Sequence, residues 1–264
     1  MTRDIVRENM SSYLGTQARK AWSADGDLYG LELELIERYF PAAPAKIIDL
    51  GCGAGRTTLG LEARGYEVDA IDLSEDLVEE ARSRVRRARI SLMDARELDF
   101  ADATFDAALF SFNGLDCVHP HRERSRVLES IHRVLRPGGI FYYSGHNGIA
   151  AWGPRPGDSV RKMVRRNRDM LLAQRRSFDE RARYLAYPEQ HGGSQILYSV
   201  LPATHLRELR GAGFTPLAVY GSRSYRTGPH VVDDRLQGLG HLARMAQISL
   251  TCPHVHYVAV RGDH

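Results

Sequence analysis

The sequence has few cysteines, few lysines and no long apolar run. Its three cysteines, Cys52, Cys117 and Cys252, are too scattered for a disulfide framework or a CxxC metal site, so we expect reduced thiols and no metal. No apolar run approaches the ~20 residues that a membrane-spanning helix needs. The first residues, Met1–Ser12, lack the apolar stretch of a secretory signal. These absences predict a cytoplasmic protein that does not use a membrane.

Concentrated positive charge is absent as well. The net charge is +3 over 264 residues, and lysine occurs only at Lys20, Lys46 and Lys162. Proteins that grip a nucleic-acid backbone carry more concentrated basicity, so nucleic acid is disfavoured as a partner. With 43% hydrophobic residues the chain is long enough for one sizeable core, and one domain with an insertion fits better than two independent domains.

What the chain does have is an alternation of strands and helices. The expected strands are short apolar runs, at Lys46–Leu50, Val68–Leu73, Arg89–Met93, Phe105–Phe112 and Ile140–Ser144. The expected helices lie between or before them, at Leu28–Phe40, Thr57–Arg64, Glu75–Arg87 and Arg122–Leu135. This order predicts a doubly wound α/β fold with a mostly parallel sheet, right-handed crossovers and helices on both faces.

After residue 145 the rhythm changes, which indicates an insertion. Asp158–Arg176 predicts a helix, and Gln195–Val200 a strand. Thr204–Ala212 is expected to be helical, whereas Thr215–Tyr220 and His254–Val260 are expected to be strands; residues 221–249 show no clear pattern. The 158–176 helix carries many arginines and one lysine, which are either its solvated face or a site for an anionic substrate. Its apolar face would comprise Val160, Met163, Val164, Met170 and Leu171.

A glycine-rich loop directly follows the first expected strand. Gly51, Gly53 and Gly55 let the backbone turn sharply and approach a ligand that side chains would block. A dinucleotide fingerprint needs a third glycine at the sixth position, where Arg56 or Thr58 stands instead. The loop therefore predicts a nucleotide-like cofactor other than NAD, the alternative being a turn that serves only the strand-to-helix geometry.

Acidic residues end the next two expected strands. Asp72 would lie beside the glycine loop in a parallel sheet, where a carboxylate can accept both ribose hydroxyl hydrogens. Asp94 can accept from an adenine amino group, and the backbone amide of Ala95 can meet the ring. The alternatives are a carboxylate that stabilises a helix N-terminus, for Asp72, and a solvated loop acid, for Asp94.

In this order the segments resemble the class I, Rossmann-like methyltransferases that use S-adenosylmethionine (SAM). Residues 48–55 resemble motif I, Ile71–Ser74 motif II, Met93–Ala95 motif III, Phe105–Asn113 motif IV, and Val134–Gly139 the phrase before the fifth strand. The resemblance covers about residues 45–145. It implies SAM as the cofactor and a seven-stranded sheet with an antiparallel last strand, for which Leu217–Tyr220 and His256–Val260 would be the final two strands.

The resemblance also implies a division of the chain. Residues 1–44 would form an N-terminal helical cap, 45–145 the SAM-binding core, 146–200 a substrate-side insertion or lid, and 201–264 the end of the core sheet with a variable insertion. The expected cofactor contacts are Asp49, Gly51, Cys52, Gly53, Gly55, Asp72, Leu73, Asp94, Ala95, Ser111 and Phe112.

Motif IV bears on the acceptor. Enzymes of this class that methylate exocyclic amines of bases usually carry an Asn/Asp/Ser-Pro-Pro-aromatic tetrapeptide there, and cytosine C5 enzymes need a cysteine after proline; Phe110–Gly114 matches neither. It is similar to the small-molecule branch, which implies methylation of an oxygen, nitrogen or carbon atom in specialised metabolism. The alternatives are an RNA or protein methyltransferase and a SAM-binding module without activity. A homodimer is compatible with the sequence.

Catalysis by such an enzyme is mainly in-line positioning, and a base is needed only if the acceptor must lose a proton. His119 and His146 are the candidate bases, because an unperturbed histidine is half deprotonated near neutral pH. They follow the fourth and fifth strands, where open α/β sheets bind ligands. Alternatively, His119 is solvated and His146 only bonds its neighbours. The expected substrate contacts are Tyr13, Trp22, Tyr29, Asn113, Asp116 and Asn147, with ordinary packing as the alternative for the three aromatic residues.

Overall fold

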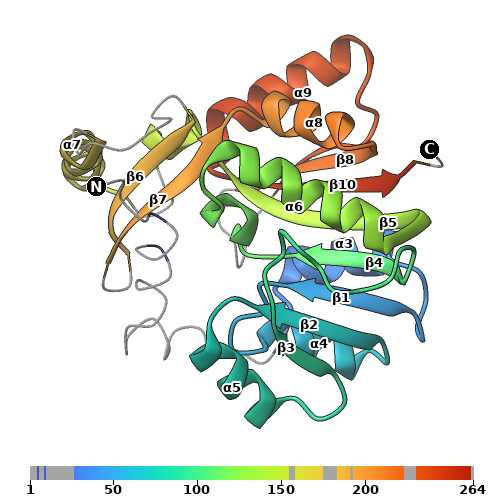
Figure 1. The fold of residues 1–264 in the computed structure, drawn as a ribbon. Helices are drawn as coiled ribbons and strands as arrows, with labels where there is room; N and C mark the ends of the chain where they lie inside the picture. Colours follow the sequence, from blue (N-terminus) through green and yellow to red (C-terminus); the bar gives the residue numbers. More distant parts are fainter. Residues whose placement is uncertain are drawn as a thin grey trace.

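A ten-stranded sheet forms the centre of the protein (Figure 1). The computed structural model describes Ile5, Asn9 and residues 27–154, 158–174, 183–190, 193–222 and 230–262. Along the sheet the strands follow the order β3-β2-β1-β4-β5-β10-β8-β9. Their bounds are β1 Lys46–Leu50, β2 Glu67–Asp72, β3 Arg89–Leu92, β4 Phe105–Phe110, β5 Leu135–Asn147, β8 Phe214–Ser222, β9 His230–Asp233 and β10 His254–Arg261.

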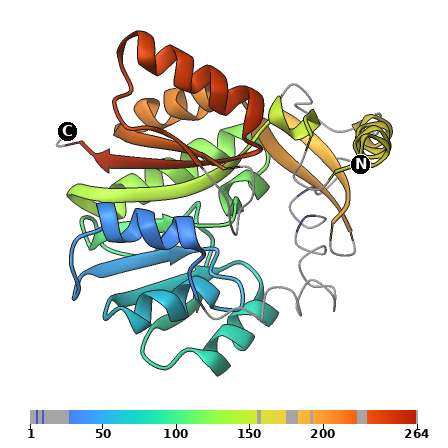
Figure 2. The same cartoon turned by 180° about the vertical axis from the view of Figure 1, so that it is seen from behind.

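Helices cover both faces of this sheet, as the sequence predicts (Figures 1 and 2). On one face α6 (His121–Val134), α8 (Pro202–Gly211) and α9 (Gly238–Thr251) contribute buried apolar side chains to one core cluster. On the other face α3 (Gly30–Tyr39), α4 (Arg56–Ala63) and α5 (Glu75–Arg84) contribute to a second cluster. Because successive side chains of a strand point to opposite faces, Ile47 and Ile48 enter different clusters. The doubly wound α/β fold is confirmed.

The expected number of seven strands is wrong for the described part of the chain, because three more strands join the sheet. The seven expected strands are β3, β2, β1, β4, β5, β10 and β8, and β10 runs antiparallel between β5 and β8. β9 extends the edge beyond β8. β5 continues past the expected end to Asn147, and this extension pairs with β7 (Gly193–Val200), which in turn pairs with β6 (Tyr184–Gln190).

The β6–β7 hairpin lies past the carboxyl end of β5, where Ser199 pairs with His146. Figure 1 shows it beside the sheet, with α7 (Val160–Gln174) packed outside it. Two short 3₁₀ turns border the same region, η1 (Gly114–Cys117) after β4 and η2 (Ala150–Trp152) after β5. Ile5 packs in a cluster with side chains of β6, β7 and α7. The carboxyl ends of β4 and β5 are therefore covered by residues far apart in sequence.

Several boundaries differ from the expected ones. β5 begins at Leu135, directly after α6, and includes Pro137–Gly139, which the motif pattern places before the fifth strand. On α7 only Met170 and Ala173 are buried, whereas Val164 and Leu171 are each 58% exposed. The expected apolar face of α7 is therefore wrong apart from Met170, because the middle of the helix contacts its neighbours through polar side chains: Arg166 and Asn167 donate to the carbonyls of Gly153 and Trp152. Within the described ranges, no helix is long and apolar enough to cross a membrane.

Candidate functional site

The loop after β1 needs glycine for two different reasons. Gly51, Gly53 and Gly55 have φ of 61°, 55° and 85°, in the left-handed region that other residues avoid. A Cβ on Gly51 would lie 2.9 Å from the Phe110 ring, which is a clash. A Cβ on Gly53 would meet no atom within 4 Å, so the backbone at Gly53 borders open space. The loop thus exposes main chain to a cavity, as a ligand-binding turn must.

Asp72 ends β2 and holds this loop from the neighbouring strand. Its Oδ2 accepts from the Gly53 amide and its Oδ1 from the Ser74 amide, each at 2.9 Å. The parallel register that pairs Leu50 with Ile71 brings the two segments together. Burial raises the pKa of Asp72, although the amide hydrogen bonds oppose that rise. Each carboxylate oxygen keeps a further lone pair for a ligand hydroxyl.

A cavity of about 240 Å³ lies at the carboxyl ends of β1 to β4, the place where open α/β sheets bind ligands. Most of the expected cofactor contacts line it: Gly51, Cys52, Gly53, Asp72, Leu73, Asp94, Ala95, Ser111 and Phe112. His119 lines the same cavity. The structure therefore brings the four motifs and one candidate base together around a single space.

Asp49 and Gly55 do not line the cavity, in contrast to the sequence expectation. The Asp49 side chain is 1% exposed, and its Oδ2 accepts from the hydroxyls of Thr57 and Thr58 at 2.6 and 2.7 Å. Burial raises its pKa to about 6, although both hydrogen bonds oppose the rise. Gly55 instead allows close packing, since a Cβ there would lie 3.1 Å from Val85. Both residues position the loop and α4 from behind.

Asp94 lines the cavity with its carboxylate already engaged. Arg96 donates to it from the backbone amide at 2.9 Å, from Nε at 2.8 Å and from Nη2 at 2.5 Å. Burial alone would raise the pKa of Asp94, but these hydrogen bonds hold it below the usual value. Arg96 also lines the cavity and is missing from the sequence prediction. The sequence signal for Arg96 was its position two residues after Asp94, which brings a guanidinium within reach of that carboxylate.

A buried ion pair joins α3 to the glycine loop, and it too is missing from the sequence prediction. Arg56 donates to both carboxylate oxygens of Glu32, at 2.7 and 2.9 Å, and also lines the cavity. Ser111 donates to the same carboxylate. Tyr29, an expected substrate contact, does not line the cavity; its ring lies 4.0 Å from the Arg56 guanidinium carbon. A glutamate three residues after Tyr29, the residue that caps the start of α3, was the available signal.

The chain reverses sharply after β4. Phe112 and Asn113 have φ of 52° and 60°, two consecutive left-handed residues that are not glycine. Such backbone strain concentrates at functional sites. The Ser144 hydroxyl accepts from the Asn113 amide at 2.9 Å and helps to hold the turn. Phe112, Gly114 and His119 line the cavity, and the His119 ring packs edge-on against Tyr184 of β6, with centroids 4.8 Å apart.

Three other residues expected on the acceptor side do not line the cavity: Asn113, Asp116 and His146. Nδ1 of His146 lies 3.0 Å from Oδ2 of Asp116, and Nε2 of His146 lies 3.3 Å from Nδ2 of Asn113. Asp116 is fully buried and Asn113 is 4% exposed, so neither is open to a substrate in this conformation. Their expected direct substrate contact is therefore replaced by contacts within the protein.

Asn147 has a structural task instead of the expected substrate contact. Its Nδ2 lies within 3.1 Å of the carbonyl oxygens of Ile248, Ser249 and Cys252, which close the C-terminus of α9. Its side chain is fully buried because β10 returns beside β5. Tyr13 and Trp22 lie outside the described residues.

Comparison with known proteins agrees with this geometry. Residues 47–139 match the family model described as a methyltransferase domain. The chain is 32% identical over 107 residues to a putative methyltransferase of Bacillus subtilis, covering 39% of this chain and 43% of the relative. It is 28% identical over 156 residues to a ubiquinone biosynthesis O-methyltransferase of Methylococcus capsulatus, covering 56% and 65%. These matches span less than two thirds of each relative's length.

A solved structure extends the likeness of the fold to most of the chain. A SAM-dependent methyltransferase from Methanosarcina mazei superposes with a TM-score of 0.61 at 21% identity, covering 89% of this chain and 99% of that one. The ordered motifs, the strand order and the matched residues agree: residues 47–139 are similar to a methyltransferase domain, the chain has the fold of solved SAM-dependent methyltransferases, and the residues around the cavity are those expected to hold S-adenosylmethionine.

Proposed function

We propose that the chain transfers a methyl group from SAM to an oxygen, nitrogen or carbon atom of a small molecule of specialised metabolism. One observation carries the proposal: a single cavity is lined both by the cofactor motifs and by Cys117, Val118 and His119, which follow β4 on the acceptor side. A cofactor and an acceptor placed in one enclosed space can react in line, and such positioning supplies most of the catalysis.

The residues present fit the cofactor. The open backbone at Gly53 accommodates its methionine portion, Asp72 keeps lone pairs for ribose hydroxyls, and Leu73 is an exposed apolar side chain beside the expected adenine position. Asp94 and Ala95 lie at the end of the same cavity wall. When bound, SAM supplies a methyl group already activated by its sulfonium centre. The chain therefore has to bind, orient and exclude water.

The segments that close off the cavity favour a small acceptor. Asn9 lines the cavity and exchanges two hydrogen bonds with the backbone of Ile196 in β7, at 2.7 and 2.9 Å. We infer that the β6–β7 hairpin, to which Asn9 is hydrogen-bonded, acts as the lid expected within the 146–200 segment, and that Asn9 acts as part of the expected 1–44 cap. The Methylococcus relative, an O-methyltransferase of ubiquinone biosynthesis, supports a small-molecule acceptor. The homodimer stays a prediction.

Isothermal titration with SAM and with its demethylated product S-adenosylhomocysteine (SAH) tests the proposal. We expect micromolar binding of both by the wild type and loss of at least 10-fold in affinity in Asp72→Ala. Asp76→Ala, whose exposed carboxylate lies on the first turn of α5, is the matched control and should bind normally. Radiolabelled SAM with a panel of hydroxyl, amine and thiol acceptors then tests transfer. A folded wild type that binds neither ligand would contradict the proposal.

A further inference from the structure

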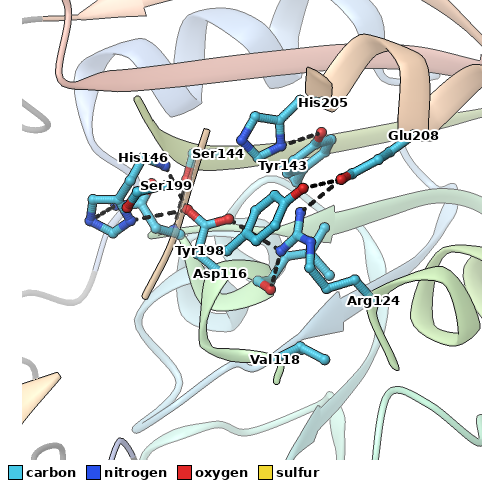
Figure 3. A network of polar contacts seen from close by, with 12 residues as sticks. Asp116, Val118, Arg124, Tyr143, Ser144, His146, Tyr198, Ser199, His205 and Glu208 are labelled. Atoms are coloured by element: carbon cyan, nitrogen blue, oxygen red, sulfur yellow. Dashed lines mark hydrogen bonds and ion pairs between the residues drawn. The ribbon is translucent and has the colours of Figure 1, made fainter. Parts of the chain in front are cut away.

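Next to the residues after β4 that line the cavity, a network of buried charged side chains ends at His146 (Figure 3). Asp116 Oδ2 accepts from the His146 backbone amide at 2.5 Å and lies 3.0 Å from its Nδ1. The second oxygen, Oδ1, lies 3.3 Å from Nη1 of Arg124. Asp116 and Arg124 are 0% and 1% exposed. One carboxylate therefore bridges a histidine ring and a buried guanidinium.

The chain continues from Arg124 toward the hairpin. Arg124 Nη2 lies 3.4 Å from Glu208 of α8, and its guanidinium carbon is 3.8 Å from the Tyr198 ring centre in β7. Tyr198 donates to Glu208, and His121 Nε2 lies 3.0 Å from the same carboxylate. Burial would lower the pKa of Arg124, but Asp116 and Glu208 raise it, so the guanidinium stays charged. A fixed positive charge in turn keeps Asp116 oriented.

This arrangement selects one tautomer of His146. A carboxylate at Nδ1 accepts a hydrogen bond, so the ring proton lies on Nδ1 and Nε2 keeps its lone pair. Asn113 Nδ2, 3.3 Å away, can donate only to such an Nε2. A general base needs this arrangement: a buried carboxylate orients the imidazole through one nitrogen, and the lone pair of the other nitrogen can accept a proton.

The surroundings of His146 allow a ligand to approach. The side chain is 14% exposed, although it does not line the cavity itself. Tyr187 of β6 and His254 of β10 flank the ring, with centroids 5.3 and 5.7 Å away. Asn113 links the His146 ring to the turn that lines the cavity, since its side chain lies 3.3 Å from Nε2 and its neighbours in sequence, Phe112 and Gly114, line the cavity. Its Oδ1 has no hydrogen-bond partner although it is buried.

We propose that His146 is the general base of the reaction, that Asp116 and Arg124 are its positioning residues, and that the acceptor carries a hydroxyl group that must be deprotonated. The inference rests on the proposed function and narrows its acceptor class. The acceptor hydroxyl takes the place beside Nε2 that the Asn113 amide holds. Charged and titratable groups around His146 are Asp116 from η1, with Arg124 of α6 on the far side of that carboxylate, His205 from α8, which contacts the His146 backbone, Tyr187 from β6 and His254 from β10.

The step balances without another reactant. The O–H bond of the acceptor breaks, its proton moves to His146 Nε2, and its electron pair forms the new O–C bond to the methyl carbon. The carbon–sulfur bond breaks with both electrons left on sulfur, which gives SAH. The total charge is unchanged, since the sulfonium becomes a neutral thioether while the neutral imidazole becomes an imidazolium stabilised by Asp116.

Two acceptors that differ in acidity test the inference. At about pH 8.5, 4-nitrophenol is already ionised and needs no base, whereas phenol keeps its proton. With both as probes and SAM saturating, we expect His146→Gln and Asp116→Asn to lower kcat for phenol by about 10²-fold or more and kcat for 4-nitrophenol by less than about 3-fold. His132→Gln on α6, a histidine outside this cluster, is the control and should leave both rates unchanged.

A second measurement guards against a merely structural loss. In His146→Gly, added imidazole should restore phenol methylation and leave 4-nitrophenol methylation unchanged. Equal losses on the two phenols, phenol-selective loss in His119→Gln but not in His146→Gln, or a wild type that binds SAH and methylates aniline but neither phenol would each overturn the inference. Failure to bind SAH would instead overturn the proposed function, so the two failures are distinguishable.

Discussion

The carboxylate of Asp72 accepts a hydrogen bond from the Gly53 amide at 2.9 Å, so the end of β2 holds the loop that follows β1. The two residues are 19 positions apart in sequence. Because β1 and β2 are parallel neighbours, the bond forms at the common carboxyl edge of the sheet. It links the expected ribose contact to the expected backbone contact of the cofactor.

The open backbone at Gly53 leads to a matched pair of substitutions. Gly53→Ala should weaken SAH binding by at least about 10-fold, because its methyl group enters the cavity, and should cost about 1 kcal/mol of folding free energy through the left-handed backbone. Gly138→Ala is the control: Gly138 also has positive φ and nothing within 4 Å of its Cβ, yet it does not line the cavity. Titration calorimetry and urea unfolding compare them. Equal loss of affinity in both variants would show that strain alone acts.

Asp49 makes stability depend on pH. Its folded-state pKa of about 6 lies above its ordinary value of 3.8, so folding favours the protonated form. The protein is stabilised by this group below pH 3.8 and loses that contribution as the pH rises through about 6. Asp49→Asn, which stays neutral, should therefore raise the free energy of unfolding at pH 8 by about 3 kcal/mol and change it little at pH 4. Asp99→Asn, at an exposed carboxylate, is the control for thermal melts. A stabilisation that is the same at both pH values would contradict this account.

The Glu32–Arg56 pair should be costly to break from either side. Arg56→Met leaves the fully buried Glu32 carboxylate without its cation, and we expect a loss of about 3 kcal/mol or more in the free energy of unfolding. The double variant Glu32→Gln with Arg56→Met should recover part of it, because no buried charge is left. Arg168→Met removes an exposed ion pair with Asp169 and should change stability by less than about 0.5 kcal/mol. Urea unfolding measures all three; an Arg56→Met variant as stable as Arg168→Met would refute the buried-charge argument.

Substitution of Asn147 distinguishes a structural role of this residue from a substrate contact. Asn147→Ala leaves the last carbonyls of α9 without their donor and should cost about 2 kcal/mol in unfolding free energy, with SAH affinity unchanged. Asn167→Ala on the partly buried α7 removes one hydrogen bond, from the Asn167 side-chain amide to the Trp152 carbonyl, and should cost less unfolding free energy. If Asn147→Ala kept its stability but raised the KM of an acceptor, the original expectation of a substrate contact would hold.

The sequence by itself determined the parallel core and most of the cofactor cavity. Strand, glycine turn and helix are local signals, and an acid at the end of the next parallel strand must lie at the same edge, so Asp72 and Asp94 could be placed without coordinates. Hairpin strand β6, edge strand β9 and helix α9 were missed, because their patterns are short or irregular and tertiary pairing decides them.

Only the tertiary structure decided which polar side chains face the cavity. Asp49 stands in motif I and Asp116 three residues after motif IV, yet the pleat of β1 and the turn of η1 direct their side chains into the interior, toward Thr57 and Arg124. Asn147 closes a helix that begins 91 residues later, at Gly238, a partnership no local pattern contains. Motif spacing specifies where a residue lies along a strand, whereas side-chain direction and long-range partners follow from packing, since most buried polar groups are stable only when they find a partner there.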